Sequence, residues 1–304
     1  MTMSALLPSW RPGRTRDAVL AFLAAAEALP VEARVAAFDN DGTLWCEKPT
    51  YVQFDFFEDA LRRRAEQDPA LLERPEFRAV LDLDMAAIGD LGLERVALAV
   101  VGLFAGMEPD AFTAEARAFM ARARHRRLGV PIPATRYRPM LELLDELRKR
   151  SFTVYLVSGS GTEFLRAVSE ELYEVPPELV VGTQVAYEFV RRADGRPRLV
   201  RTGGVIGGAN EGAAKVTGIQ SQLGRRPILV AGNSAGDREI LEWAVSGDGP
   251  GLALLVHHDD REREFAYESV SSTLTEHEPI TAIAGRLGWA VISMKDDWSA
   301  VFAG

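Results

Sequence analysis

A short apolar segment followed at once by two acidic residues constrains this chain most strongly. Residues 35–38 have the composition of a buried β-strand, Asp39 and Asp41 follow one residue apart, and Gly42 interrupts the extended segment. In an open α/β sheet, ligands bind at the carboxyl ends of the strands. Two carboxylates this close repel each other unless one is protonated or a cation lies beside them. The segment therefore predicts either a protonated carboxyl group or a bound divalent cation at a strand end.

The rest of the chain alternates between strand-like and helix-like segments. Helices are expected over residues 15–29, 137–150, 162–173, 211–223 and 237–245. Strands are expected over residues 34–38, 153–157, 179–181, 228–231, 252–256 and 290–294, with a hairpin of 184–190 and 197–202 around an Asp194–Gly195 turn. Alternation of this kind predicts an α/β fold with a Rossmann-like, doubly wound parallel sheet.

Between the first and second predicted strands the pattern is helical throughout. Helices are expected over residues 51–65, 75–88, 93–104 and 109–126, and Pro131 and Pro133 mark the return to the core. The sequence therefore predicts a helical cap, residues 46–131, inserted into a core formed by residues 1–45 and 132–304. A length of 304 residues suits one large core with a smaller insertion.

Composition narrows the partners and the location. A formal net charge of −9 gives no support for a nucleic-acid surface, and no apolar stretch approaches the roughly 18 residues of a membrane span. The apolar run 18–26 is bracketed by Asp17 and Glu27, which favours a packed helix over a signal peptide. The single cysteine, Cys46, allows no disulfide within the chain. We expect a cytoplasmic protein rather than a secreted or periplasmic one, and the sequence predicts no oligomeric state.

Three further segments bring polar residues to strand ends or helix starts. Ser158 and Gly159 follow a strand and precede a helix, where a hydroxyl and backbone N–H groups can hold phosphate. Lys215 lies on a helix after a glycine-rich loop and can act as a point charge on phosphate. Asn233 and Asp237 follow the strand 228–231. Each segment alone is typical of an ordinary turn or a solvated helix, so the interpretation depends on their order along an α/β pattern.

In that order the segments resemble the haloacid dehalogenase superfamily. Residues 34–256 are similar to its phosphoserine-phosphatase-like members, which carry a helical cap of the C1 type between the first and second motifs. The resemblance implies an Mg²⁺-dependent phosphomonoester hydrolase that acts on a small phosphorylated metabolite. Asp39 would be the nucleophile that forms an aspartyl-phosphate, and Asp41 the general acid and then the base. The groups that bind the phosphoryl oxygens would be Ser158, Gly159 and Lys215.

The resemblance also implies the metal ligands. Mg²⁺ would bind Asp39, the backbone carbonyl of Asp41, and the loop of Asn233 and Asp237, because it prefers oxygen ligands and keeps several waters. One position departs from the family pattern, since the last motif usually begins Gly-Asp and here reads Gly232–Asn233. An amide oxygen can still bind Mg²⁺, but one negative charge is missing, so Asp237 gains weight as a ligand.

Two residues after the first motif are candidates for substrate recognition. In phosphoserine-phosphatase-like enzymes an acidic residue near this point faces the substrate amine, and Glu47 lies close to that position; the alternative is a solvated linker charge. Trp45 belongs to an aromatic cluster with Tyr51, Phe54, Phe56 and Phe57. We expect most of this cluster in the core between cap and body. Part of it could line the pocket and hold an apolar or quaternary-ammonium group.

Several other functions remain open or are disfavoured. A phosphotransferase would use the same residues with an alcohol acceptor. A non-catalytic small-molecule or phosphate-binding protein is suggested by Asn233, although such a protein has no need of both Asp39 and Asp41. A dehalogenase lacks the second aspartate, so Asp41 argues against it. The segment 159–164 lacks the third glycine of a dinucleotide-binding loop, and no GxSxG elbow of a serine hydrolase is present.

Overall fold

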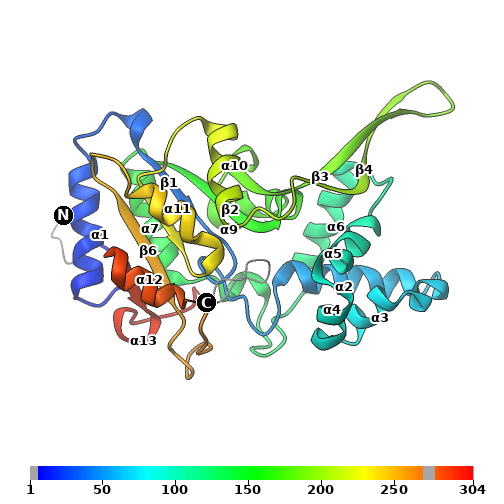
Figure 1. The fold of residues 1–304 in the computed structure, drawn as a ribbon, viewed down its shortest axis with the longest axis horizontal. Coiled ribbons are helices and arrows are strands. Elements are labelled where there is room, and N and C mark those ends of the chain that lie inside the picture. The colour runs from blue at the N-terminus through cyan, green and yellow to red at the C-terminus, as the bar shows by residue number, and fades with distance from the viewer. Residues whose placement is uncertain (1–5, 270–277, 304) are drawn as a thin grey trace.

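The computed structural model describes residues 6–269 and 278–303, which form one seven-stranded sheet with helices on both faces (Figure 1). The strand order is β4-β3-β2-β1-β5-β6-β7. Only β3 and β4 pair antiparallel, and the other neighbours pair parallel. The strands are β1 (Val35–Phe38), β2 (Thr153–Gly161), β3 (Val180–Arg191), β4 (Pro197–Ile206), β5 (Leu229–Gly232), β6 (Leu252–His257) and β7 (Ala290–Ser293). The predicted doubly wound parallel α/β fold is confirmed.

The central strand β1 is buried on both faces because two helical layers cover it. Ala36 and Phe38 belong to one apolar core with α1 and α7, whereas Val35 and Ala37 belong to a second core with α10, α11 and α12. Figure 1 shows the second set of helices in front of the sheet. The helices are α1 (Arg14–Ala26), α7 (Arg138–Lys149), α10 (Ala213–Leu223), α11 (Arg238–Ala244) and α12 (Ile280–Leu287). Burial on both faces explains why β1 reads as a continuous apolar run.

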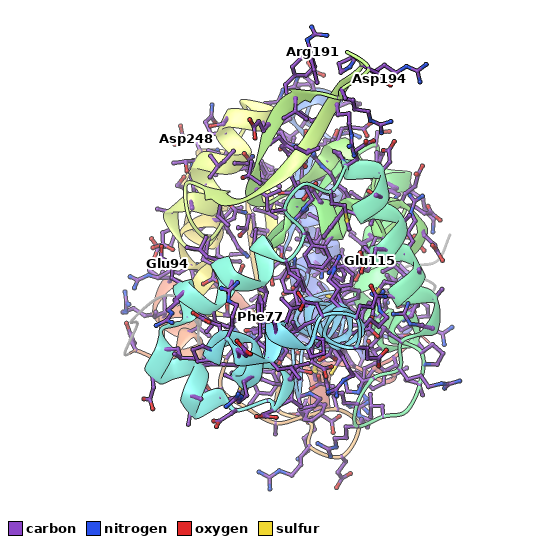
Figure 2. The ribbon with its side chains drawn as sticks, turned by 90° about the vertical axis from the view of Figure 1, so that its right-hand side faces the viewer. Phe77, Glu94, Glu115, Arg191, Asp194 and Asp248 are labelled. Carbon is purple, nitrogen blue, oxygen red and sulfur yellow. The ribbon has the colours of Figure 1, made fainter. Side chains whose placement is uncertain are left out.

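The segment between β1 and β2 contains only helices as regular structure, and we call α2 to α6 the helical block. It lies to the right of the sheet in Figure 1, and Figure 2 looks onto it with Phe77 near the centre. It has an apolar core of its own that includes Leu61, Phe77, Val80 and Val96. The helices are α2 (Val52–Ala65), α3 (Pro75–Leu81), α4 (Met85–Leu91), α5 (Leu93–Gly102) and α6 (Pro109–Arg122).

The helical block is joined to the β3–β4 hairpin by paired backbone. The N–H of Gly106 donates to the carbonyl of Arg201, and the N–H of Arg201 donates to the carbonyl of Met107, both at 2.8 Å. The Arg201 guanidinium is buried, lies 3.9 Å from the ring centre of Phe112, and forms an ion pair with Glu163. The block is therefore held to the core by backbone and side-chain contacts as well as by its two chain connections.

Local backbone geometry divides two of the predicted helices. The predicted helix 75–88 is two helices, because Leu83 has a φ of 54° and Asp84 caps α4 by accepting a hydrogen bond of 3.0 Å from the N–H of Ala87. The predicted helix 162–173 is likewise divided, into α8 (Thr162–Arg166) and α9 (Ser169–Tyr173). Sequence periodicity does not detect single residues that leave the helical region.

Several predicted strands are longer in the structure, including the second hairpin strand, which is β4. The expected strands 179–181 and 184–190 form the single strand β3, and β2 continues past Val157 to Gly161. The β2–β3 register shifts between Val157 and Gly161, which marks a β-bulge or a similar irregularity. The predicted tail strand is β7, and α13 (Met294–Asp297) follows it. None of the helices in the described ranges is long and apolar enough to cross a membrane.

Candidate active site

Most of the predicted site residues line one cavity of about 270 Å³ at the carboxyl ends of β1, β2 and β5. Asp39 and Asp41 come directly after β1 and are both buried, with 8% and 6% of their surface exposed. Gly42 follows with a φ of 74°, and a Cβ atom there would lie 2.0 Å from Nδ2 of Asn233, so only glycine fits. The other predicted residues in the lining are Glu47, Ser158, Gly159, Lys215 and Asn233.

Lys215 joins two of the aspartates. Its ammonium group on α10 is buried and lies 2.7 Å from Oδ1 of Asp39 and 2.6 Å from Oδ1 of Asp237. Burial opposes the charge on Lys215, but the two carboxylates outweigh it and raise its pKa. Burial and repulsion from Asp237 raise the pKa of Asp39, and Lys215 opposes that rise. The lysine therefore stays charged beside the predicted nucleophile.

Asp41 is held by two donors from different parts of the chain. The indole N–H of Trp45 donates to Oδ1 at 2.8 Å, and the hydroxyl of Ser160 donates to Oδ2 at 2.7 Å. Burial raises the pKa of Asp41, and these two hydrogen bonds oppose the rise. A fixed carboxyl group with a raised pKa is suited to giving up and taking back a proton.

The end of β2 also borders the cavity, through Ser158, Gly159 and Ser160. Ser158 is buried, its Oγ accepts a hydrogen bond of 3.1 Å from the N–H of Ser160, and its carbonyl accepts one of 3.0 Å from Nδ2 of Asn210. Gly159 follows, and a Cβ atom there would lie 2.8 Å from Oε1 of Glu211. These contacts fix the backbone where the predicted phosphate-binding residues meet the cavity.

In the loop after β5, the side chains of Asn233 and Asp237 have different hydrogen-bond partners. Oδ2 of Asp237 accepts from the backbone N–H groups of Asn233 and Ser234, both at 3.0 Å, while Oδ1 accepts from Lys215. Both Asp237 oxygens are therefore occupied. In contrast, Oδ1 of Asn233 accepts only a long hydrogen bond of 3.4 Å from Thr43 within the described residues. Asn233 thus presents the freer oxygen.

The two candidate specificity residues lie in different surroundings. Glu47 is buried but lines the cavity, and its Oε1 accepts from Nδ2 of Asn233 at 3.2 Å and from the hydroxyl of Tyr267 at 2.8 Å. Trp45 is fully buried and is absent from the cavity lining, so the structure gives it contact with Asp41 rather than with substrate. Tyr51, Phe54 and Phe57 are the members of the aromatic cluster that do reach the cavity.

Comparison with known families decides the relationship. The sequence profile of the haloacid dehalogenase-like hydrolases matches residues 36–242, which is more than half of the chain. The chain belongs to the haloacid dehalogenase-like hydrolases. The match begins within β1 and ends in α11, so it includes every predicted site residue. The resemblance inferred from the sequence motifs is confirmed at this level.

The chain is similar to several solved structures, and two of them, with TM-scores of 0.50 or more, share its fold. A protein of unknown function from Bordetella pertussis Tohama I is 21% identical, with 86% of this chain and 98% of that chain covered and a TM-score of 0.54. A functionally unknown protein from Anaerococcus prevotii is 15% identical, covers 81% and 86%, and has a TM-score of 0.50. A probable phosphoserine phosphatase from Vibrio cholerae is 14% identical, covers 92% and 74%, and has a TM-score of 0.44. No curated protein sequence matches the chain.

The donor set of this haloacid dehalogenase-like hydrolase fits a hard cation. Across residues 6–269 and 278–303, no group of three or more histidine, cysteine, aspartate and glutamate side chains is placed to hold a metal ion. The oxygen donors at these strand ends include the carboxylate of Asp39 and the amide oxygen of Asn233, and the resemblance implies the backbone carbonyl of Asp41 as a third. Mg²⁺ accepts such a small oxygen set because it keeps several waters.

Sequence analysis missed three residues of this hydrolase's site. Ser160 contacts Asp41, Asn210 fixes the end of β2, and Glu211 lies in the cavity lining. The signal for Ser160 was present, because residues i and i+2 of a strand share a face and Ser160 follows Ser158 by two. Asn210 and Glu211 precede α10, which begins at Ala213 rather than at the predicted residue 211, and no motif in the sequence marked either of them.

Proposed function

We propose that this hydrolase is an Mg²⁺-dependent phosphatase that cleaves small phosphorylated metabolites through an aspartyl-phosphate intermediate. The observation that carries the proposal is the arrangement of Asp39, Asp41 and Lys215 around one cavity. A nucleophilic carboxylate, a proton-carrying carboxyl group and a fixed cation are the groups that phosphoryl transfer by this route requires.

Each residue has a defined part in the proposed reaction. Asp39 attacks phosphorus while the bond to the leaving oxygen breaks, and Asp41 gives its proton to that oxygen. Asp41 then takes a proton from the water that attacks the aspartyl-phosphate, which releases phosphate and restores Asp39. Throughout, Lys215, the Ser158 hydroxyl and the backbone N–H of Gly159 offset the negative charge on the phosphoryl oxygens.

The proposed cation site uses Asp39, the backbone carbonyl of Asp41 and Asn233. When bound, Mg²⁺ would offset the charge of the phosphate group and of the nucleophile. We assign Asp237 to holding Lys215 and the Asn233 loop, because both of its oxygens already accept hydrogen bonds. Its place in the motif as a direct ligand is the alternative.

The remaining parts of the proposal concern the cap, specificity and location. We propose that residues 46–131 act as a cap over the core of residues 1–45 and 132–304, supported by the helical-block residues that line the cavity. Glu47 is proposed to contact substrate from the loop between β1 and α2. A cytoplasmic location is supported by the single cysteine, Cys46, which is free and buried.

A phosphotransferase is the second candidate, favoured by one further observation. A neighbouring cavity of about 770 Å³ shares Gln53, Phe57, Gly159 and Glu211 with the first cavity. An acceptor alcohol bound there would compete with water for the aspartyl-phosphate.

Release of phosphate and of p-nitrophenol from p-nitrophenyl phosphate tests both candidates. We expect Mg²⁺-dependent release that Asp39→Asn reduces on the order of 10⁴-fold or more, with the fold intact by circular dichroism. The control Asp248→Asn changes an exposed carboxylate, labelled in Figure 2, and should keep full activity. Full activity in a well-folded Asp39→Asn protein would contradict the mechanism. An excess of p-nitrophenol over phosphate in the presence of an alcohol would favour the transferase.

A further inference from the structure

The cavity above Asp39 and Asp41 has a charged floor and an apolar roof. The strand ends and loops of the core supply the floor, whereas α2, α3, α4 and α5 of the helical block supply the roof. Large roof residues include Phe54, Phe57, Met85, Ile88, Leu93 and Val96. None of the described lining residues from these helices carries a charge. The one roof amide, Gln53, is engaged through Oε1, which accepts from the N–H of Gly161 at 2.8 Å.

Only some of the apolar roof residues are buried in the core of the helical block. Ile88 and Val96 are each only 3% exposed and belong to the core of the block. Met85 and Leu93, however, are 64% and 40% exposed at the edge of the same cavity. These two side chains gain little from the block itself, so an apolar ligand between roof and floor would bury surface that is otherwise in water.

The floor carries the charged groups of the cavity. Its acids are Asp39, Asp41, Glu47 and Glu211, and its one cation is Lys215. These groups lie where the proposed phosphoryl group and cation bind. A charged substituent that extended from the ester oxygen toward the roof would lose its hydration without finding a counter-charge there, which is costly.

We propose that the substrate is a phosphate monoester of a small, uncharged, apolar alcohol. The inference rests on the proposed phosphatase function and adds the chemical class of the leaving group. The phosphoryl group lies on the floor and the alcohol extends against the roof. A volume of about 270 Å³ suits an alcohol with a short chain or a single ring, since sites for drug-sized ligands begin at about 300 Å³.

A series of n-alkyl phosphates, from methyl to octyl, tests the inference. We expect kcat/KM to rise about two- to fourfold for each added methylene and then to level off once the cavity is filled. O-phosphoserine and glycerol 3-phosphate should fall below the alkyl phosphates of similar size. Equal rates along the series, or a preference for the polar esters, would overturn the inference while leaving the phosphatase intact. Absence of hydrolysis of every ester would instead overturn the phosphatase proposal itself.

A matched pair of substrates separates apolar from cationic recognition. Choline phosphate and 3,3-dimethylbutyl phosphate have the same shape and differ in one positive charge. We expect the neutral ester to have the higher kcat/KM. A higher value for choline phosphate would overturn the inference and assign the selectivity to Glu47 and Glu211.

Two variants connect the preference to the roof. Leu93→Gln changes a roof residue that is 40% exposed, and Leu72→Gln changes a block residue that is 39% exposed and lines neither of the two cavities. We expect Leu93→Gln to reduce the gain per methylene and Leu72→Gln to preserve both the rate and the gain. The same loss in both variants would contradict a specific role for the roof.

Discussion

The indole N–H of Trp45 donates a hydrogen bond of 2.8 Å to Oδ1 of Asp41, four residues earlier in the chain. The backbone reinforces this turn, since the N–H of Gly42 donates to the carbonyl of Trp45 at 2.9 Å. Ser160 holds the other carboxyl oxygen. The proposed general acid is therefore fixed by its own loop on one side and by β2 on the other.

Trp45→Phe tests whether this orientation matters for turnover. Phenylalanine keeps an aromatic ring against Tyr173 but has no donor for Asp41. Loss of one hydrogen bond to a charged group is worth about 1.4 kcal/mol, so we expect kcat to fall about tenfold with little change in KM. Steady-state kinetics measures this split. In the control Trp289→Phe, the buried indole N–H has no partner among the described residues, so kcat should not change.

Lys215→Met leaves Asp39 and Asp237 facing each other without a cation. In Mg²⁺-free buffer we expect the free energy of unfolding to fall by about 3 kcal/mol, because removing one partner strands buried charge. The loss should be larger at higher pH, where protonation of the aspartates is less able to relieve the repulsion. Urea unfolding measures it. The double variant Lys215→Met/Asp237→Asn should recover part of the loss, and no recovery would argue against repulsion as the cause.

Asn233→Asp restores the charge that is usual at this position of the family motif. Nδ2 of Asn233 donates to Oε1 of Glu47, so the substitution places two carboxylates together. Without Mg²⁺ we expect the free energy of unfolding of the variant to be about 2 kcal/mol below that of the wild type. Addition of Mg²⁺ should raise the free energy of unfolding more in the variant than in the wild type. Asn210→Asp is the control, because Asn210 bonds backbone carbonyls instead. An equal Mg²⁺ response in both variants would argue against Asn233 as a ligand.

We expect the carboxylate of Glu264 to make a contribution to stability that is lost in acid. Burial alone would raise its pKa, but hydrogen bonds from His258 and Cys46 outweigh that effect and lower it below the ordinary 4.5. A carboxyl group whose pKa is lower in the folded state stabilises the fold fully at pH values above its pKa in the unfolded state, about 4.5. This stability is lost as the pH falls from 4.5 through the folded-state pKa.

Glu264→Gln should therefore flatten the acid side of the stability profile. We expect a loss of about 1 to 3 kcal/mol at neutral pH and a shallower decline toward low pH than in the wild type. Urea unfolding between about pH 3 and pH 7 measures both. A decline as steep as that of the wild type would mean that other carboxylates dominate.

The sequence predicts the acids of the site better than their surroundings. Asp39 and Asp41 could be placed because a buried strand, two carboxylates and a glycine turn are local features. Ser160 was missed, because the predicted strand ended at Val157 whereas β2 continues to Gly161 and brings Ser160 to Asp41. The order of strands and helices was likewise predictable, whereas Leu83 divided one predicted helix through a single backbone angle.

The roof of the cavity was the least predictable part. The sequence predicted helices in this segment, but an apolar helix face that packs in a core and one that lines a cavity look the same in the sequence. Ile88 and Leu93 both line the cavity, yet one is packed in the block and the other is exposed. Only the three-dimensional packing distinguishes them.

The paired backbone between Arg201 and residues 106–107 restricts how a substrate can enter. Lifting the helical block away from the sheet must either break these two backbone hydrogen bonds or bend the β3–β4 hairpin along with the block. The hairpin tip, marked by Arg191 and Asp194 in Figure 2, is distant in sequence from the loop that carries Asp39 and Asp41. Because β3 also pairs with β2, the hairpin anchors the helical block to the sheet, and any opening of the block would have to bend the hairpin.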